Sequence, residues 1–403
     1  MSYTPPEEIL DKYAKVLVNF ALGGGTGIKK GEVVYLQCPT SALPFYLALS
    51  KVLIDSGATI INGLGDDMHG LGRYFYEHAS HEQLTRFLPE YYKGLVKVTD
   101  HRIAILANHD VRELNSVDTK KIMLRQTSAK PLVKWFDAKE NAGKYTWTLA
   151  SYGTPSMAKE AGLPLNEYWQ QIIDACFLDL DDPIAKWKEV SKELSRVAKT
   201  LTDLRIEKLH VKGDDVDMRY TLGEKRRWLG GGGRNIPSFE IFTSPDWRGT
   251  EGWIHFDQPM TKYGPKIECI KLRFKKGKVV ESSATTQQKF LRELIATDPG
   301  AAQIGEFSLT DKRLSRITKF MHDDLYDENM GGPFGNTHLA LGRSYLDTYD
   351  GDVKKLTGAQ AKKLGYTESV VHTDMISTTD RTVTATLASG NQKVIYKNGQ
   401  FTV

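Results

Sequence analysis

Short apolar segments alternate with amphipathic helical segments through the first half of the chain. We expect strands near 33–38, 59–61, 102–107 and 145–150, with a helix over 41–56 and another around Ile9, Tyr13, Val16 and Phe20. Parallel strands need long crossover connections, which are usually helices, whereas antiparallel strands can be joined by tight turns. This alternation therefore predicts an α/β domain with a largely parallel sheet that is covered on both faces.

The second half follows a different pattern, in which strands predominate. We expect strands near 208–211, 215–222, 251–256 and 266–274, one helix over 287–295, and a hairpin around Lys397-Asn398-Gly399. At 403 residues the chain is too long for one ordinary core. A long helix that opens at Asp182-Pro183 separates the two patterns. We therefore predict an N-terminal α/β domain over 1–204 and a β-rich α+β domain over 205–403.

The bulk composition excludes several classes of protein. The 54 basic and 50 acidic residues leave a net charge of +4, which gives little reason to expect a nucleic-acid or membrane partner. Cys38, Cys176 and Cys269 are too scattered for a disulfide framework. No signal peptide is apparent, and no window approaches the roughly 18 apolar residues of a membrane span. A cytoplasmic protein is the expectation.

The stretch from Gly305 to Asp374 is rich in side chains that bind metals. It contains two imidazoles and three carboxylates in apolar or glycine-flanked settings, namely Glu306, Glu328, His338, His372 and Asp374. Histidine and carboxylate ligands suit zinc or a similar divalent ion, and a carboxylate-rich site can hold two ions that activate water. The pair His372 and Asp374 lies in an expected strand over 369–376, where residues two apart face the same side.

Three further expectations concern individual side chains. Glu240 lies in an alternating strand pattern, and taken alone it is expected on the solvent face. His338 could open a helix that carries Tyr345 on the same face, two turns further on. The phenol of Tyr345 could then donate to an oxyanion, although a core tyrosine is the better explanation of the residue in isolation.

Taken together, these residues resemble the aminopeptidase T / aminopeptidase S family of cocatalytic metallopeptidases. The resemblance covers nearly the whole chain and is looser in the N-terminal half. It rests on Asn235-Ile-Pro-Ser-Phe-Glu240-Ile-Phe-Thr-Ser-Pro245, Gly305-Glu306, Asp327-Glu328-Asn329, His338-Leu-Ala-Leu-Gly342 with Tyr345, and His372-Thr-Asp374.

The resemblance implies a function and a role for each of these residues. It implies cleavage of N-terminal residues from short peptides with a free N-terminus, by a water activated at a two-metal site, in a homodimer that encloses the active site. The ions would be zinc, with cobalt or manganese possible. Glu306 would be the bridging or base-like carboxylate and Tyr345 the catalytic phenol. The implied metal-shell residues are Glu240, Glu306, Glu328, His338, His372 and Asp374.

This chain departs from the family's pattern in two places. The family usually has Thr-Gly before the ligand that matches Glu240, whereas this chain has Ser238-Phe239. The link between Glu328 and His338 is also longer here and rich in glycine. A longer link could reshape the substrate pocket and puts the role of Glu328 and the specificity in question.

Other functions remain open at this point. A metal-dependent amidase or carboxypeptidase would need the same ions and the same water, and a requirement for a free N-terminal amine would separate it from an aminopeptidase. A structural zinc site is disfavoured because the cysteines lie far from the histidines in the sequence. The run Gly23-Gly-Gly-Thr-Gly27 lacks the Gly-Lys-Ser/Thr ending of a phosphate-binding loop.

Overall fold

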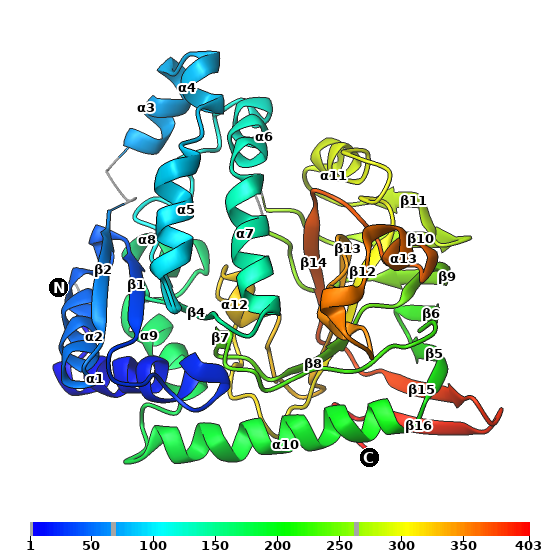
Figure 1. The fold of residues 1–403 in the computed structure, drawn as a ribbon. Coiled ribbons are helices and arrows are strands. Elements are labelled where there is room, and N and C mark those ends of the chain that lie inside the picture. The colour runs from blue at the N-terminus through cyan, green and yellow to red at the C-terminus, as the bar shows by residue number, and fades with distance from the viewer. Residues whose placement is uncertain (1–2, 66–69, 262–265) are drawn as a thin grey trace. The chain divides into compact units, whose positions relative to one another are not determined.

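The computed structural model describes residues 3–65, 70–261 and 266–403 (Figure 1). The chain divides into two compact units. Unit 1 comprises 1–188 and 232–237, and unit 2 comprises 189–231 and 238–403. The division falls inside the long helix α10, Pro183–Asp203, whose first turn is capped by the Asp182 carboxylate, which accepts from the Ala185 N–H at 2.9 Å. None of the helices among the described residues combines the length and the hydropathy that a membrane span requires.

Unit 1 contains the predicted parallel sheet. Its strand order is β2-β1-β3-β4-β7, and every neighbouring pair is parallel. The strands are β1 (Val33–Cys38), β2 (Thr59–Leu64), β3 (His101–Leu106), β4 (Thr146–Ser151) and β7 (Asn235–Ile236). The helices are α1 (Glu7–Val16), α2 (Leu43–Asp55), α3 (Leu71–His78), α4 (His81–Thr85), α5 (Pro89–Val98), α6 (Thr119–Ser128), α7 (Lys130–Asn141), α8 (Pro155–Glu160) and α9 (Leu165–Ala175).

One tyrosine ties the first helices of unit 1 to its sheet. The ring of Tyr13 in α1 stacks on Phe45 of α2 with centroids 4.7 Å apart, and both side chains are fully buried. The Tyr13 hydroxyl donates to the Ser151 carbonyl of β4 at 3.2 Å. A buried phenol usually needs such an acceptor, so this contact combines apolar burial with a satisfied polar group.

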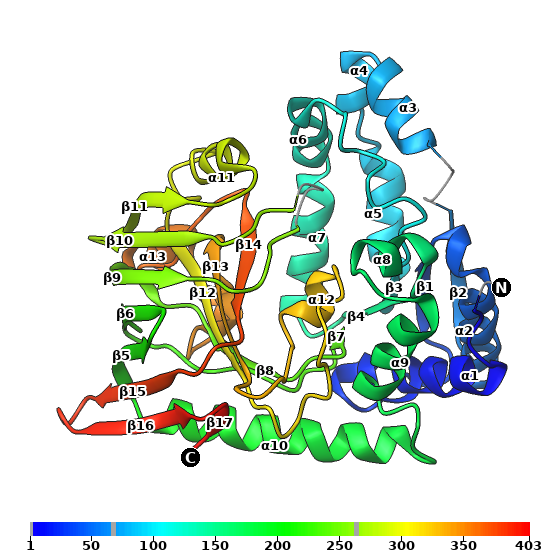
Figure 2. The ribbon, with the colours of Figure 1, turned by 180° about the vertical axis from the view of Figure 1, so that it is seen from behind.

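Unit 2 is built from two antiparallel sheets and a few short helices (Figure 2). The larger sheet has the order β11-β10-β9-β6-β5-β15-β16-β17. Its strands are β5 (Ile206–Gly213), β6 (Val216–Thr221), β9 (Asp246–His255), β10 (Lys271–Lys275), β11 (Lys278–Ser283), β15 (Thr382–Leu387), β16 (Gln392–Lys397) and β17 (Gln400–Phe401). The predicted helix and C-terminal hairpin are both present. The strand expected from residue 266 begins only at Lys271, and Ile267 instead forms an isolated bridge with Met260.

The smaller sheet has the order β14-β13-β12-β8. Its strands are β8 (Glu240–Thr243), β12 (Ile304–Thr310), β13 (Asn336–Gly342) and β14 (His372–Ser377), and the helices of unit 2 are α11 (Gln288–Ile295), α12 (Asp324–Asp327) and α13 (Gly358–Lys363). One face of this sheet is apolar and packs inward: the Phe307 ring contacts Tyr220 of β6 at a centroid distance of 4.9 Å. The other face carries the predicted metal-binding residues.

His338 lies on a strand, so the prediction that it opens a helix is wrong. In β13 it pairs with Ser308 of β12 on one side and with Ile376 of β14 on the other. The prediction failed because β13 is buried along its whole length. A strand buried on both faces shows no alternation of apolar and polar residues, and its pattern cannot be told from that of a short buried helix.

A bulge in β12 directs Glu306 to the polar face of the smaller sheet. Ile304 pairs with Leu341, yet Glu306 pairs with Ala340, so Gly305 is the extra residue. Such an insertion changes which face the following side chains occupy. A side chain at position 305 would collide with the chain, because a Cβ there would lie 2.5 Å from the carbonyl oxygens of both Gly342 and Arg343.

We expect Gly305→Ala to lower the free energy of unfolding by about 1–3 kcal/mol, the usual cost of overpacking a filled site. Gly358→Ala is the matched control, because a Cβ at position 358 meets nothing within 4 Å. Chemical denaturation of both variants and the wild type measures the difference. Equal stability of the two variants would contradict this account of the bulge.

Candidate metal centre

Neighbouring strands bring the predicted ligands to one face of the smaller sheet. Glu306, Ala340 and Asp374 form one row across β12, β13 and β14, and His372 pairs with Gly342 in the adjoining row. Ala340 carries only a methyl group, so it leaves room for the carboxylates of Glu306 and Asp374 on either side of it. The alternation of His372 and Asp374 on one face of β14 is as predicted.

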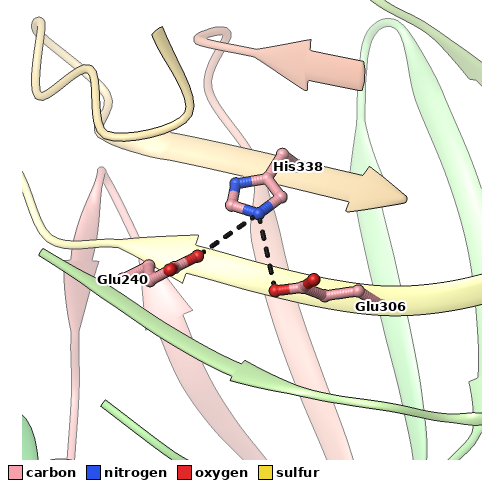
Figure 3. Close-up of side chains that lie close together, drawn as sticks. All are labelled: Glu240, Glu306 and His338. Atoms are coloured by element: carbon pink, nitrogen blue, oxygen red, sulfur yellow. Dashed lines mark ion pairs between the residues drawn. The ribbon is translucent and has the colours of Figure 1, made fainter. Parts of the chain in front are cut away.

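The ligand atoms form two groups that overlap at Glu306. One group contains Glu240, Glu306 and His338, the other contains Glu306, His372 and Asp374, and within each group the candidate ligand atoms lie within 4.8 Å of one another. Figure 3 shows the first group, with the His338 ring directed between the two carboxylates. The expectation that Glu240 faces solvent is wrong, because its side chain is only 13% exposed and lies beside His338.

The two oxygens of Glu306 contact different histidines. Its Oε1 lies 3.7 Å from His338 Nε2, and its Oε2 lies 3.3 Å from His372 Nε2. His338 Nε2 is also 3.4 Å from Glu240 Oε2, and His372 Nε2 is 3.5 Å from Asp374 Oδ1. A carboxylate with one oxygen in each group can bridge two cations, and this donor set of oxygen and imidazole nitrogen fits divalent transition metals.

Burial and charge strongly perturb the titration of these groups. Burial raises the pKa of Glu240, and the Glu306 charge adds to this, to about 7. Burial raises the pKa of Glu306 too, but hydrogen bonds and charge from His338 and His372 outweigh it, so the pKa is lowered. Burial lowers the pKa of both imidazoles. The neighbouring carboxylates outweigh it and raise the pKa of His338 to about 9 and that of His372 to about 10.

Glu328 lies outside both groups but within their electric field. It follows α12, and its pKa is raised well above the usual value by burial and then by the charges of Glu240, Asp374 and Glu306. Asn329 connects this segment to the Glu240 strand: its Oδ1 accepts from the Phe239 N–H at 2.6 Å, while its Nδ2 donates to the Leu325 carbonyl at 3.0 Å. No local sequence pattern indicates this supporting role of Asn329.

Tyr345 reaches the site from a loop rather than from a helix. Its ring packs edge-on against His372 with centroids 4.8 Å apart and also contacts Phe242 of β8. The Tyr345 N–H donates to Ser244 Oγ at 2.9 Å, which fixes the loop. Burial and then the Glu306 charge raise the pKa of Tyr345 well above its usual value, so the phenol keeps its proton.

The histidine pKa values predict proton release on metal loading. Because both imidazoles carry an extra proton near neutral pH, and a coordinating imidazole must be neutral, the imidazoles should release about two protons per chain, and Glu240 and Glu328, whose pKa values are raised, should add to this number. Calorimetric titrations with zinc, in buffers of different ionisation enthalpy, measure this number. The release of protons from the imidazoles should vanish once the pH exceeds their raised pKa values, about 9 for His338 and about 10 for His372. A count near zero at neutral pH would contradict the assignment.

The same shifts give the stability of the metal-free protein a pH dependence. A histidine whose pKa is higher in the folded than in the unfolded state stabilises the fold fully below its unfolded value of 6.5. This contribution is then lost as the pH rises through about 9 for His338 and about 10 for His372.

Comparison with known proteins finds similarity over nearly the full length of the chain. The chain is 28% identical over 409 residues to aminopeptidase T of Thermus thermophilus, covering 96% of this chain and 98% of that protein. It is 26% identical over 415 residues to aminopeptidase 2 of Geobacillus stearothermophilus, covering 98% of each. The solved structure of wild-type AmpT from Thermus thermophilus superposes with a TM-score of 0.83 at 25% identity, over 98% of this chain and 100% of that one. Residues 6–401 match the sequence profile of the thermophilic metalloprotease (M29) family, and the chain belongs to that family.

Proposed function

We propose that this protein is a metal-dependent aminopeptidase that removes N-terminal residues from short peptides at a centre of two divalent ions. The observation that carries the proposal is the position of Glu306, whose two oxygens face two different histidines in two overlapping ligand groups. Membership of a metalloprotease family and relatives named as aminopeptidases support the same reaction.

The residues present fit such ions. Glu240 and His338 would hold one ion, His372 and Asp374 the other, and Glu306 would serve both, with Glu328 as a further carboxylate of the shell. Zinc is the expected metal, and cobalt or manganese would suit the same donors. When bound, the ions would supply Lewis-acid polarisation of the scissile carbonyl and a more acidic water.

The protein's own groups would then move protons and stabilise charge. Glu306 would take a proton from the attacking water and deliver it to the leaving amine. If the ions occupy both oxygens of Glu306, the nearby carboxylate of Glu328 would carry the proton instead. Tyr345, which keeps its proton, would donate to the oxygen that becomes negative. The cluster of carboxylates would attract the positively charged α-amine of a peptide, which favours exopeptidase cleavage.

Three features of the proposal have separate grounds. A homodimer that encloses the active site rests on the family resemblance, a cytoplasmic location on the few scattered cysteines, and a division into domains at 204/205 on the change of pattern near the end of the long helix. Sedimentation of the purified protein and limited proteolysis test the first and the last.

The reaction is tested with Leu-Leu-Leu beside its N-acetylated form, after removal of metal and reloading with zinc or cobalt. We expect metal-dependent cleavage of the free peptide alone. Glu306→Gln should abolish cleavage and weaken the binding of both ions. It should leave the fold intact, as circular dichroism would show. Equal cleavage of both peptides would instead favour a metal-dependent amidase or endopeptidase, and full activity of Glu306→Gln would refute the role of Glu306.

Tyr345→Phe removes only the proposed oxyanion donor. We expect kcat to fall by about 100- to 1,000-fold, the usual effect of losing such a donor, with little change in KM. Tyr349→Phe is the matched control, because that ring lies in the same loop beside the Lys225 ammonium. A Tyr345→Phe enzyme as active as the control would show that the tyrosine is structural.

A further inference from the structure

Three buried polar atoms near His338 have no hydrogen-bond partner among the described residues. They are His338 Nδ1, Thr310 Oγ1 and Asn336 Oδ1. Their residues are at most 1% exposed. A buried polar atom without a partner costs about 1–3 kcal/mol, so three of them in one place require an explanation.

Strand pairing brings the three residues together. Thr310 and Asn336 are directly opposite each other in β12 and β13, and His338 is two residues further along β13. Residues two apart on a strand face the same side, so all three share the face that carries Glu306. Figure 3 shows the second ring nitrogen of His338 directed away from both carboxylates.

In the other histidine of the site, the second ring nitrogen has a hydrogen-bond partner. His372 Nδ1 contacts the Arg343 carbonyl oxygen at 2.7 Å, which leaves Nε2 free to face Glu306 and Asp374. A histidine that binds metal almost always donates its other N–H to an acceptor, which fixes the tautomer and the ring orientation. Nδ1 of His338 carries a hydrogen both in the imidazolium form, in which the Nε2–H faces Glu240 and Glu306, and in the form whose Nε2 binds a metal ion, so it needs an acceptor.

The chemistry of the three atoms defines what can lie between them. Asn336 Nδ2 donates to the Asp327 carbonyl at 3.0 Å, so its Oδ1 is oriented as an acceptor. His338 Nδ1–H is a donor, and the Thr310 hydroxyl can act either way. A cation is excluded by the N–H donor, and an anion by the amide oxygen. A water molecule can accept from the imidazole and donate to the other two, which gives it three hydrogen bonds, the usual number for a buried water.

We propose that Thr310 and Asn336 hold a buried water molecule that accepts the Nδ1–H of His338 and thereby aims Nε2 at the metal site. Thr310 and Asn336 are positioning residues in this arrangement. The inference rests on the proposed function for the purpose of the water, but not for its presence.

The test compares the full-length wild type with Thr310→Val, which keeps the shape of the side chain and removes the hydroxyl. We expect crystal structures to show a water bonded to the three atoms in the wild type and displaced or lost in the variant. Zinc competition against a chromophoric chelator should show one of the two ions bound about 10- to 100-fold more weakly, as is usual when an outer-shell partner is lost. Thr310→Ser, which restores the hydroxyl, should restore the affinity.

Thr250→Val is the matched control. Thr250 is a buried threonine of β9 whose hydroxyl likewise has no partner among the described residues, but it lies on the larger sheet. Wild-type crystals without this water, or a Thr310→Val protein that binds both ions as tightly as Thr250→Val, would overturn the inference. A wild type that holds the water yet binds no zinc would contradict the proposed function alone.

Discussion

Unit 2 depends on burying several like charges on one face of a four-stranded sheet. Glu240, Glu306 and Asp374 share that face, and Glu328 lies close enough to feel all three. Burying charge costs several kcal/mol unless opposite charge compensates it. His338 and His372 supply part of the compensation, and their raised pKa values express it. In the metal-free protein the raised pKa values of Glu240 and Glu328 favour their neutral forms, which removes the rest of the negative charge. Divalent cations would replace these protons.

The opposite face of the same sheet makes this concentration of charge tolerable. Phe307, next to Glu306 in the chain, packs against Tyr220 and Trp228 of unit 2. Leu309 and Leu339 are buried on that side as well. Each strand of the sheet therefore contributes one row to the hydrophobic core and one to the polar site. The rigidity of the core carries over to the ligands, which supports a preorganised site.

Local sequence patterns predicted much of the fold and of the site. They failed where the position of a side chain depends on residues far away in the sequence. The parallel sheet of unit 1 and the shared face of His372 and Asp374 follow from periodicities within a few residues. Glu240 was expected in solvent because its burial depends on His338, almost a hundred residues later. The bulge at Gly305 depends on the carbonyl oxygens of Gly342 and Arg343, and no local pattern contains them. Asn329 was overlooked as a support for the same reason, since its partner Phe239 precedes it by 90 residues.

The two histidines differ in which groups fix the orientation of their rings. His372 Nδ1 forms a hydrogen bond with the main-chain oxygen of residue 343, so every amino acid at that position supplies the same acceptor. The exposed side chain at that position is therefore free to diverge between relatives without disturbing the imidazole. His338 has no such main-chain acceptor among the described residues. Its surroundings at positions 310 and 336 must keep their polar side chains, so we expect sequence drift to be tolerated at 343 and resisted at 310 and 336.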